Sequence, residues 1–169
     1  MANSYKNTTC IYSENPDETQ SIGNTIGRLS FPGDLILMTG ELGAGKTCFT
    51  QGLLNGLGSV DCLRSPTFVL MMEHKGRIPL YHADLYRISK ITELESIGLD
   101  EYLNSDGICV VEWADRFKPI FQLDHLAIKI SWDKSGPSSN IRHINLTPKG
   151  LRHSKLLNDL TDSTSHKII

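Results

Sequence analysis

The residues best suited to chemistry lie at positions 40 to 47, which read Gly-Glu-Leu-Gly-Ala-Gly-Lys-Thr. They fit the phosphate-loop pattern G-x-x-x-x-G-K-[ST] at every fixed position. Glycines allow successive backbone N–H groups to turn inward around phosphate oxygens, and the N-terminus of the following helix adds partial positive charge. Lys46 is expected to reach the β- and γ-phosphates, and the Thr47 hydroxyl to bind Mg²⁺. The other residues expected to contact the nucleotide here are Glu41, Gly43, Ala44, Gly45 and Cys48.

A magnesium-dependent nucleotide hydrolase also needs a carboxylate at the end of a strand that neighbours the loop. Glu112 follows four apolar residues and so ends a buried strand in an acid. Asp84 lies in a second β-like run, where His82 would point to the same face. We expect Lys46, Asp84 and Glu112 to form the catalytic set. A lone histidine such as His82 is more often packed than catalytic.

Other nucleotide-binding classes fit the sequence less well. A dinucleotide loop would need a third glycine where Cys48 stands. A GTP switch would need an N-K-x-D segment, which the sequence lacks, and its D-x-x-G match at 133–136 falls in a late polar loop. A small-molecule kinase with the same phosphate loop remains open. The arginines that could form its lid are scattered: Arg64, Arg77, Arg87 and Arg116.

The phosphate loop requires a strand before it and a helix after it, and the surrounding sequence supplies both. A continuous apolar run predicts a buried strand over 34–39, and the spacing of apolar residues predicts a helix from Lys46 to Leu57 that Gly58 ends. Asn15-Pro16 predicts the start of an earlier helix. The full set of expected elements is strands at 9–13, 34–39, 67–73, 78–87, 107–113, 126–132 and 141–146, and helices at 16–30, 46–57, 92–103 and 151–160.

These elements predict an α/β fold, a single P-loop NTPase domain over 1–169 in which helices flank a mixed sheet. Two details are specific. Thr92 and Glu95 match a capping box that would open the helix at 92–103. Residues 161–169 are expected to be a frayed tail.

The amino-acid composition limits the partners and the cellular location that we expect. The 169 residues carry a net charge of −2 and contain no dense Lys/Arg block, so a large nucleic-acid-binding face is not expected. The four cysteines include no CxxC pair, which disfavours a zinc or redox site. The polar N-terminus lacks an apolar signal core, and no stretch approaches the roughly 18 apolar residues of a membrane helix. We therefore expect a cytoplasmic protein without a membrane partner.

Several further segments occur in a fixed order around these residues. They are Pro32-Gly33-Asp34, the loop and helix GELGAGKTCFTQGL at 40–53, SPTF at 65–68, YHADLYRI at 81–88, ELESIGLDEYL at 93–103 and GICVVEWADR at 107–116. Together they resemble the bacterial TsaE (YjeE) family. The resemblance implies a Mg²⁺-dependent ATPase that binds the TsaB and TsaD proteins. It would assist the transfer of a threonylcarbamoyl group to the adenosine next to the anticodon of tRNAs that read ANN codons, meeting tRNA only indirectly.

The resemblance also implies roles for individual residues. Glu112 would be the second magnesium ligand, and Asp84 would position or activate the attacking water. Ser65 and Thr67 would lie in a switch that senses the γ-phosphate. Trp113 would lie at the edge of the site, with a core tryptophan as the alternative. Candidates for contacts with the base or phosphates are Thr19, Asp115, Arg116 and Arg142.

One departure from the family pattern is visible after the loop. Many members continue as KTT-F-x-R-G, whereas this chain reads Lys-Thr-Cys-Phe-Thr-Gln-Gly over 46–52. The second threonine and the arginine are therefore absent, so no role is assigned to those two positions.

Overall fold

The computed structural model describes residues 8–63, 70–133, 136 and 139–163. In chain order the elements are β1 (Thr9–Ser13), α1 (Pro16–Leu29), β2 (Leu35–Thr39), α2 (Lys46–Gly56), β3 (Met71–His74), β4 (Leu80–Asp84), α3 (Ile91–Ser96), α4 (Leu99–Leu103), β5 (Ile108–Glu112), the 3₁₀ helix η1 (Ala114–Ile120), β6 (His125–Trp132), β7 (Arg142–Lys149) and α5 (Leu151–Ser163). Within these residues, no helix is long and apolar enough to cross a membrane.

Seven strands of the described chain form one mixed sheet in the order β1-β7-β6-β2-β5-β4-β3. The centre is parallel, because β2 pairs in parallel with both β5 and β6, and β4 pairs in parallel with β5. The outer strands β1, β7 and β3 pair antiparallel with their neighbours. The parallel centre brings the carboxyl ends of β2, β4 and β5 to the same edge of the sheet. Ligands commonly bind at such an edge, at the point where the strand order reverses direction.

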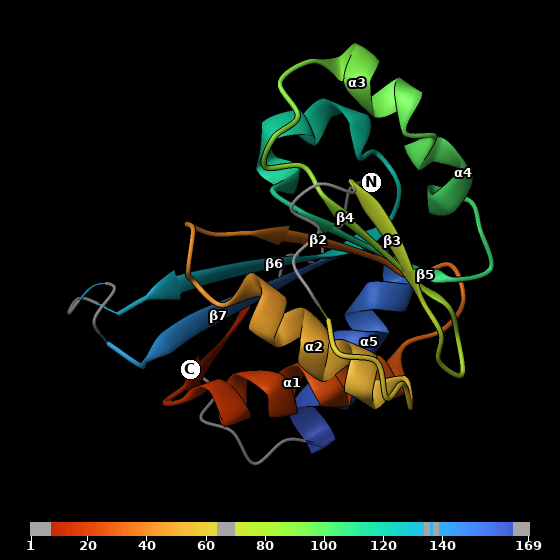
Figure 1. The fold of residues 1–169 in the computed structure, drawn as a ribbon. Helices are drawn as coiled ribbons and strands as arrows, with labels where there is room; N and C mark the ends of the chain where they lie inside the picture. The colour runs from red at the N-terminus through yellow and green to blue at the C-terminus, as the bar shows by residue number, and fades with distance from the viewer. Residues whose placement is uncertain (1–7, 64–69, 134–135, 137–138, 164–169) are drawn as a thin grey trace, which may run out of the picture.

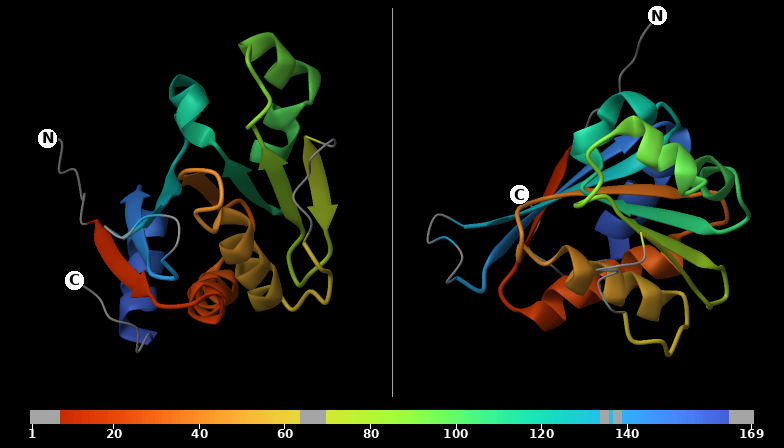
Figure 2. Two further views of the ribbon diagram at one scale, coloured as in Figure 1. Left: turned by 60° about the vertical axis from the view of Figure 1, so that its left-hand side comes forward. Right: turned by 45° about the horizontal axis from the view of Figure 1, so that its top comes forward.

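Helices cover both faces of the sheet (Figures 1 and 2). Side chains alternate along β2, so that Ile36 and Met38 pack into the core beneath α1, α2 and α5. Leu35 and Leu37 pack into the opposite core, beneath α3, α4 and η1. The continuous apolar run thus fills two cores at once, as the sequence predicted for this strand.

The two helices nearest the phosphate loop pack against each other through glycines. A Cβ atom at Gly52 of α2 would lie 2.0 Å from the Gln20 carbonyl oxygen, and one at Gly23 of α1 would lie 2.3 Å from the Phe49 carbonyl oxygen. Only glycine permits this approach. The Asn15 side chain caps α1 by accepting a hydrogen bond from the Glu18 N–H at 2.9 Å, as expected. The start of α2 is therefore held against a helix whose own start is capped.

Most predicted elements are present, but several bounds differ: β7 runs to Lys149 rather than to residue 146, for example, and the 3₁₀ helix η1 was not predicted. The expected helix over 92–103 is two short helices, because Gly98 adopts a left-handed conformation with φ +65°. The first of them begins at Ile91, and the Ser89 hydroxyl donates to the Glu93 carboxylate, so the expected capping box at 92–95 is wrong. Strand β4 ends at Asp84 rather than at residue 87. Helix α5 continues to Ser163, so residues 161–163 are helical rather than frayed.

Candidate functional site

The loop between β2 and α2 has the backbone geometry that the phosphate-loop pattern requires. Gly40, Gly43 and Gly45 all have positive φ, at 142°, 81° and 110°. At Gly40 space is also limiting, because a Cβ atom would lie 2.3 Å from the Ile130 carbonyl oxygen. The Ala44 carbonyl accepts a hydrogen bond from the Arg142 Nε at 2.9 Å, so β7 braces the loop from the side. The structure thus places Arg142, one of the predicted contact residues, directly against the loop.

Lys46 lies across this loop, with little exposed surface. Its Nζ donates to the carbonyl oxygens of Gly40 at 2.8 Å and Glu41 at 3.0 Å. It also lies 3.9 Å from the centroid of the Trp113 ring, within the range of a cation–π contact. Burial lowers the pKa of Lys46, and the carboxylates of Glu112 and Asp84 oppose that shift. A cationic group therefore stands at the mouth of the loop, close to both predicted acids.

The two acids lie side by side on neighbouring parallel strands, because Asp84 of β4 pairs in register with Glu112 of β5. Glu112 is 2% exposed, and its Oε1 accepts a hydrogen bond from His82 Nε2 at 3.0 Å. Asp84 is half-buried, and its Oδ1 accepts a hydrogen bond from the Tyr86 N–H at 2.9 Å. The structure thus brings these two carboxylates, from separate runs of the sequence, to one place.

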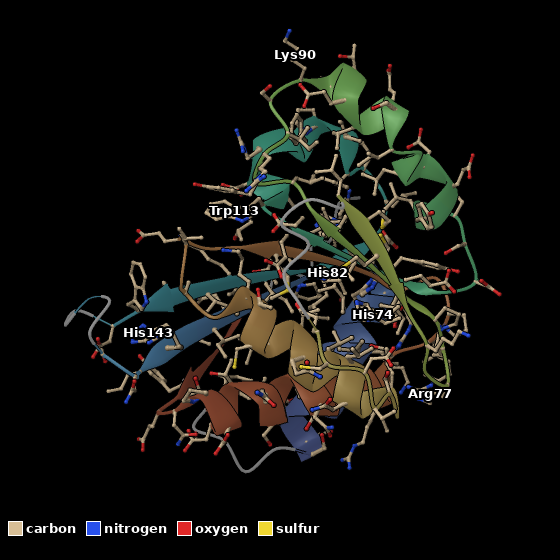
Figure 3. All side chains as sticks on the ribbon, in the orientation of Figure 1. His74, Arg77, His82, Lys90, Trp113 and His143 are labelled. Atoms are coloured by element: carbon tan, nitrogen blue, oxygen red, sulfur yellow. The ribbon has the colours of Figure 1, made fainter. Side chains whose placement is uncertain are left out.

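Trp113 follows Glu112 directly and has φ +61°, a conformation that bulky residues rarely adopt. Its ring packs on the Tyr86 ring, with centroids 5.0 Å apart, and Figure 3 shows it beside the phosphate loop. Part of the same side chain packs on the core under α3 and α4. Trp113 therefore packs partly on this core and partly against Lys46, whose Nζ lies 3.9 Å from its ring centroid.

A cavity of about 380 Å³ opens between these elements. Its lining residues are Leu42, Gly43, Gly45, Lys46, Thr47, Cys48, Leu70, Asp84, Tyr86, Arg87, Glu112 and Trp113. All three predicted catalytic residues and both predicted metal ligands are among them. Tyr86 was not singled out from the sequence, and Arg87 was named only as one of the scattered arginines of a kinase lid, although both lie just past the carboxyl end of the strand that ends at Asp84. Leu42, at a variable position of the loop pattern, was not predicted either.

Some predicted residues do not line this cavity. Thr19 is buried, and its hydroxyl lies 2.7 Å from the Ser13 hydroxyl. Glu41 and Ala44 belong to the loop but are not among the residues that line the cavity. Asp115 and Arg116 line an adjoining hollow of about 580 Å³, shared with Tyr86 and Trp113.

Two predicted residues make contacts that hold the chain itself. Arg116 donates to the carbonyl oxygens of Leu85 and Tyr86, which follow Asp84. Cys48 lines the cavity, and its Sγ lies 3.4 Å from the Pro16 carbonyl oxygen, while burial raises its pKa. The thiol therefore contacts the start of α1, and its raised pKa favours the protonated thiol over a reactive thiolate. Ser65 and Thr67 lie outside the described residues.

Comparison with known proteins agrees with this geometry. The family described as "Threonylcarbamoyl adenosine biosynthesis protein TsaE" matches residues 13–141. This chain belongs to the TsaE family. A relative from Bacillus subtilis, named tRNA threonylcarbamoyladenosine biosynthesis protein TsaE, is 39% identical over 148 residues, which is 87% of this chain and 90% of that protein. A relative of the same name from Streptomyces coelicolor is 37% identical over 137 residues, or 79% and 92% of the two chains.

The fold comparison agrees. The crystal structure of Bacillus subtilis YdiB superposes with a TM-score of 0.77 at 33% sequence identity, covering 93% of this chain and 96% of that one. The mixed sheet with its flanking helices is therefore the family fold, and the predicted fold class is confirmed.

Proposed function

We propose that this protein is a Mg²⁺-dependent ATPase that serves the threonylcarbamoyl modification of tRNA. One observation carries the hydrolytic part: Lys46, Asp84 and Glu112 line a single cavity at the mouth of the glycine-rich loop. A cation, two acids and a cradle of backbone N–H groups are the parts that phosphoryl transfer requires. The tRNA part rests on the names of the relatives. These names favour this function over the small-molecule kinase.

The chain's own residues fit a magnesium nucleotide. The Thr47 hydroxyl and the Glu112 carboxylate are hard oxygen donors on the same cavity, which is the ligand type that Mg²⁺ selects. Bound Mg²⁺ would neutralise charge on the β- and γ-phosphates. Lys46 would exchange its two loop carbonyls for phosphate oxygens, since its ammonium group already lies across the loop. Trp113 and Tyr86 offer aromatic surface at the rim of the cavity.

Asp84 is suited to a different task from Glu112. Its carboxylate is half-buried and is oriented by the Tyr86 N–H, so it can accept a hydrogen bond from a water molecule in the cavity. A carboxylate in this place would orient the attacking water and take up its proton. Asp84 would thus govern turnover, while Glu112 would govern metal binding.

The partners that we propose are the TsaB and TsaD proteins, with tRNA met only through them. The net charge of −2 supports the indirect role, because a face that holds tRNA alone would be strongly basic. Leu42, at 70% exposure, and Tyr86, at 47%, stand at the rim of the cavity, where a partner could sense nucleotide. Size-exclusion runs with ATP, ADP and no nucleotide are expected to show nucleotide-dependent association with the pair. Tight binding of isolated tRNA by this chain would contradict the proposal.

The nucleotide site itself is tested by Lys46→Ala. Loss of a charged hydrogen-bond donor typically costs about 1.5–3 kcal/mol, so the affinity for Mg-ATP is expected to fall by about 10- to 150-fold. Calorimetry measures this, and Lys155→Ala, at an exposed position on α5, is the matched control. Unchanged affinity in Lys46→Ala would place the nucleotide elsewhere. Release of ADP only when a small acceptor is added would instead favour a kinase.

A further inference from the structure

His82 holds an unusual place for a polar residue. It lies on β4 with no exposed surface, and its Nε2 is 3.0 Å from Glu112 Oε1. Its neighbours in sequence and register that face the same core are apolar, namely Leu80, Ile108 and Val110. Figure 3 shows His82 between the sheet and α2. An imidazole in this layer therefore stands where a leucine or valine would be the ordinary choice.

The ring gains little stability from this burial. Its Nδ1 has no hydrogen-bond partner in the part of the chain that the structure describes. A buried polar atom without a partner typically costs about 1–3 kcal/mol. The hydrogen bond to Glu112 is the compensating interaction, and the partner in that bond is a residue of the cavity. The placement of His82 is thus explained by what it does to Glu112 rather than by packing.

The direction of this hydrogen bond follows from the partners. A carboxylate only accepts, so Nε2 carries the hydrogen and donates it. In the strand register Asp84 lies beside Glu112. His82 lies two residues before Asp84 on the same strand, on the core side. Oε1 is therefore held from the core, and within the part of the chain that the structure describes no hydrogen bond occupies Oε2, which remains for a ligand in the cavity that Glu112 lines.

We propose that His82 is a positioning residue for Glu112, fixing the carboxylate so that one oxygen faces the cavity as a metal ligand. This inference rests on the proposed Mg²⁺-ATPase function. Hydrogen-bond partners of metal ligands orient those ligands, and their loss typically lowers metal affinity or activity by about 10–100-fold. The sequence placed His82 among packed histidines, because a single histidine on a strand carries no mark of its partner.

The test compares His82→Leu, His82→Gln and Glu112→Gln in calorimetry of ATP with Mg²⁺ and with EDTA. His82→Leu is expected to lower the affinity gained from Mg²⁺ by about 10–100-fold and to leave the affinity in EDTA unchanged. The amide nitrogen of Gln can replace Nε2, so His82→Gln is expected to keep most of the gain. A purely structural role would show no such rescue and no selective loss with Mg²⁺.

His74→Leu is the matched control. His74 lies on the same hairpin and is buried, and its Nε2 also lacks a hydrogen-bond partner among the described residues, but it contacts Asp61 at 3.9 Å rather than Glu112. It is expected to leave the gain from Mg²⁺ unchanged. If His82→Leu does not fold, His82→Asn replaces it, because the shorter amide cannot reach Glu112 and should lose the gain that His82→Gln keeps.

Two results are informative in different ways. Wild-type dependence on Mg²⁺ in folded His82→Leu or His82→Asn, together with a loss in Glu112→Gln, would overturn the role of His82 alone. Wild-type dependence in Glu112→Gln as well would overturn the assignment of Glu112 and with it the metal site of the proposed function.

Discussion

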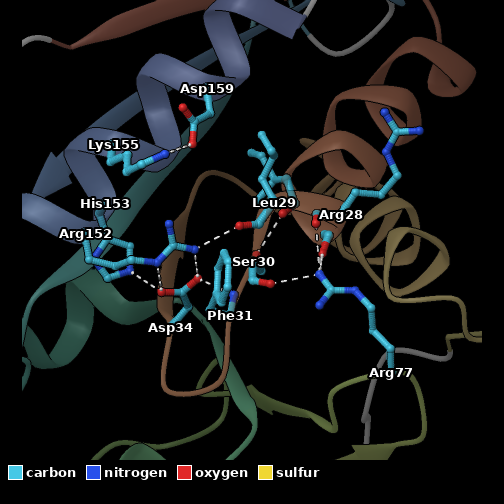
Figure 4. Close-up of polar contacts among 12 residues, drawn as sticks. Arg28, Leu29, Ser30, Phe31, Asp34, Arg77, Arg152, His153, Lys155 and Asp159 are labelled. Carbon is cyan, nitrogen blue, oxygen red and sulfur yellow. Dashed lines mark hydrogen bonds and ion pairs between the residues drawn. The ribbon is translucent and has the colours of Figure 1, made fainter.

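Two buried carboxylates lie at opposite ends of the central strands and differ in the hydrogen bonds that compensate their burial. Asp34, just before β2, is 3% exposed, and Glu112, at the end of β5, is 2% exposed. Asp34 accepts hydrogen bonds from Arg152 Nε at 3.1 Å and Nη2 at 2.7 Å, and from the Phe31 N–H at 2.8 Å (Figure 4). Among the described residues, Glu112 accepts a single hydrogen bond, from His82.

The Asp34 end is a closed network. Arg152 also donates to the Leu29 carbonyl, at the end of α1, and its guanidinium lies 4.6 Å from the centroid of the Phe31 ring. Arg77 donates to the carbonyl oxygens of Gly27, Arg28 and Ser30 at the end of α1. The charge of Asp34 is thus used to join α1, β2 and α5.

This difference in hydrogen bonding distinguishes a buried carboxylate that stabilises the fold from one that is available to a ligand. A carboxylate whose oxygens are all bonded fixes the fold and has nothing left for a ligand. A carboxylate held at one oxygen, beside Lys46 and at the wall of a cavity, keeps its other oxygen for chemistry. Variants at the two ends should therefore change different quantities.

The largest effect is expected from Asp84→Asn, at the Glu112 end. Loss of a water-orienting carboxylate typically slows a reaction by about 10²–10⁴-fold. ATP binding and the melting temperature should change little, because the amide keeps the shape of the side chain and can still accept the hydrogen bond from the Tyr86 N–H. Steady-state hydrolysis with calorimetry and thermal melts measures all three. Normal turnover in a folded variant would show that Asp84 is not catalytic.

The Asp34 end should show the reverse. Asp34→Ala leaves Arg152 without its buried partner, and breaking a buried pair typically costs about 3–5 kcal/mol of unfolding free energy. The affinity for ATP should stay at the wild-type value in the folded fraction. Urea unfolding measures the loss. Lys155→Ala, which breaks the exposed pair with Asp159 on the same helix, is the control and should cost only about 0.3–0.5 kcal/mol. Equal costs in the two variants would mean that burial of the pair does not matter.

The smallest expected effect is a dependence of stability on pH. It also concerns the Asp34 end of the molecule, where His153 lies. Burial lowers the pKa of His153, against the pull of Asp34, and burial also lowers the pKa values of His74 and His125. A histidine whose folded-state pKa lies below the ordinary value of 6.5 binds protons preferentially in the unfolded state. Stability should therefore be full above about pH 6.5 and fall as the pH drops below it. Melting temperatures at pH 7.5 and 5.5 measure this, and His153→Gln should flatten the dependence. A higher melting temperature at pH 5.5 would contradict the assigned shifts.

The sequence by itself determined the local parts of this protein. The glycines, Lys46 and Thr47 of the loop are neighbours in the chain, so their chemistry is readable from spacing. The apolar run before Glu112 identified both a strand and the acid at its end. The local prediction was wrong for the helix at 92–103. Glu93 contacts Ser89 and the helix begins at Ile91 rather than at residue 92, and Gly98 divides it in two.

Only the tertiary structure decided which of these parts meet. Asp34 and Arg152 are 118 residues apart, and Arg142 reaches a carbonyl 98 residues away. Strand order set Asp84 beside Glu112 and brought His82 to the same carboxylate. Such pairs leave no periodic trace in a sequence, because the period of a strand reports which face a side chain occupies and not which strand lies next to it. The contrast between Asp34 and Glu112 arises for the same reason: each is an acid at a strand end, and only its neighbours in space decide how many of its oxygens remain for a ligand.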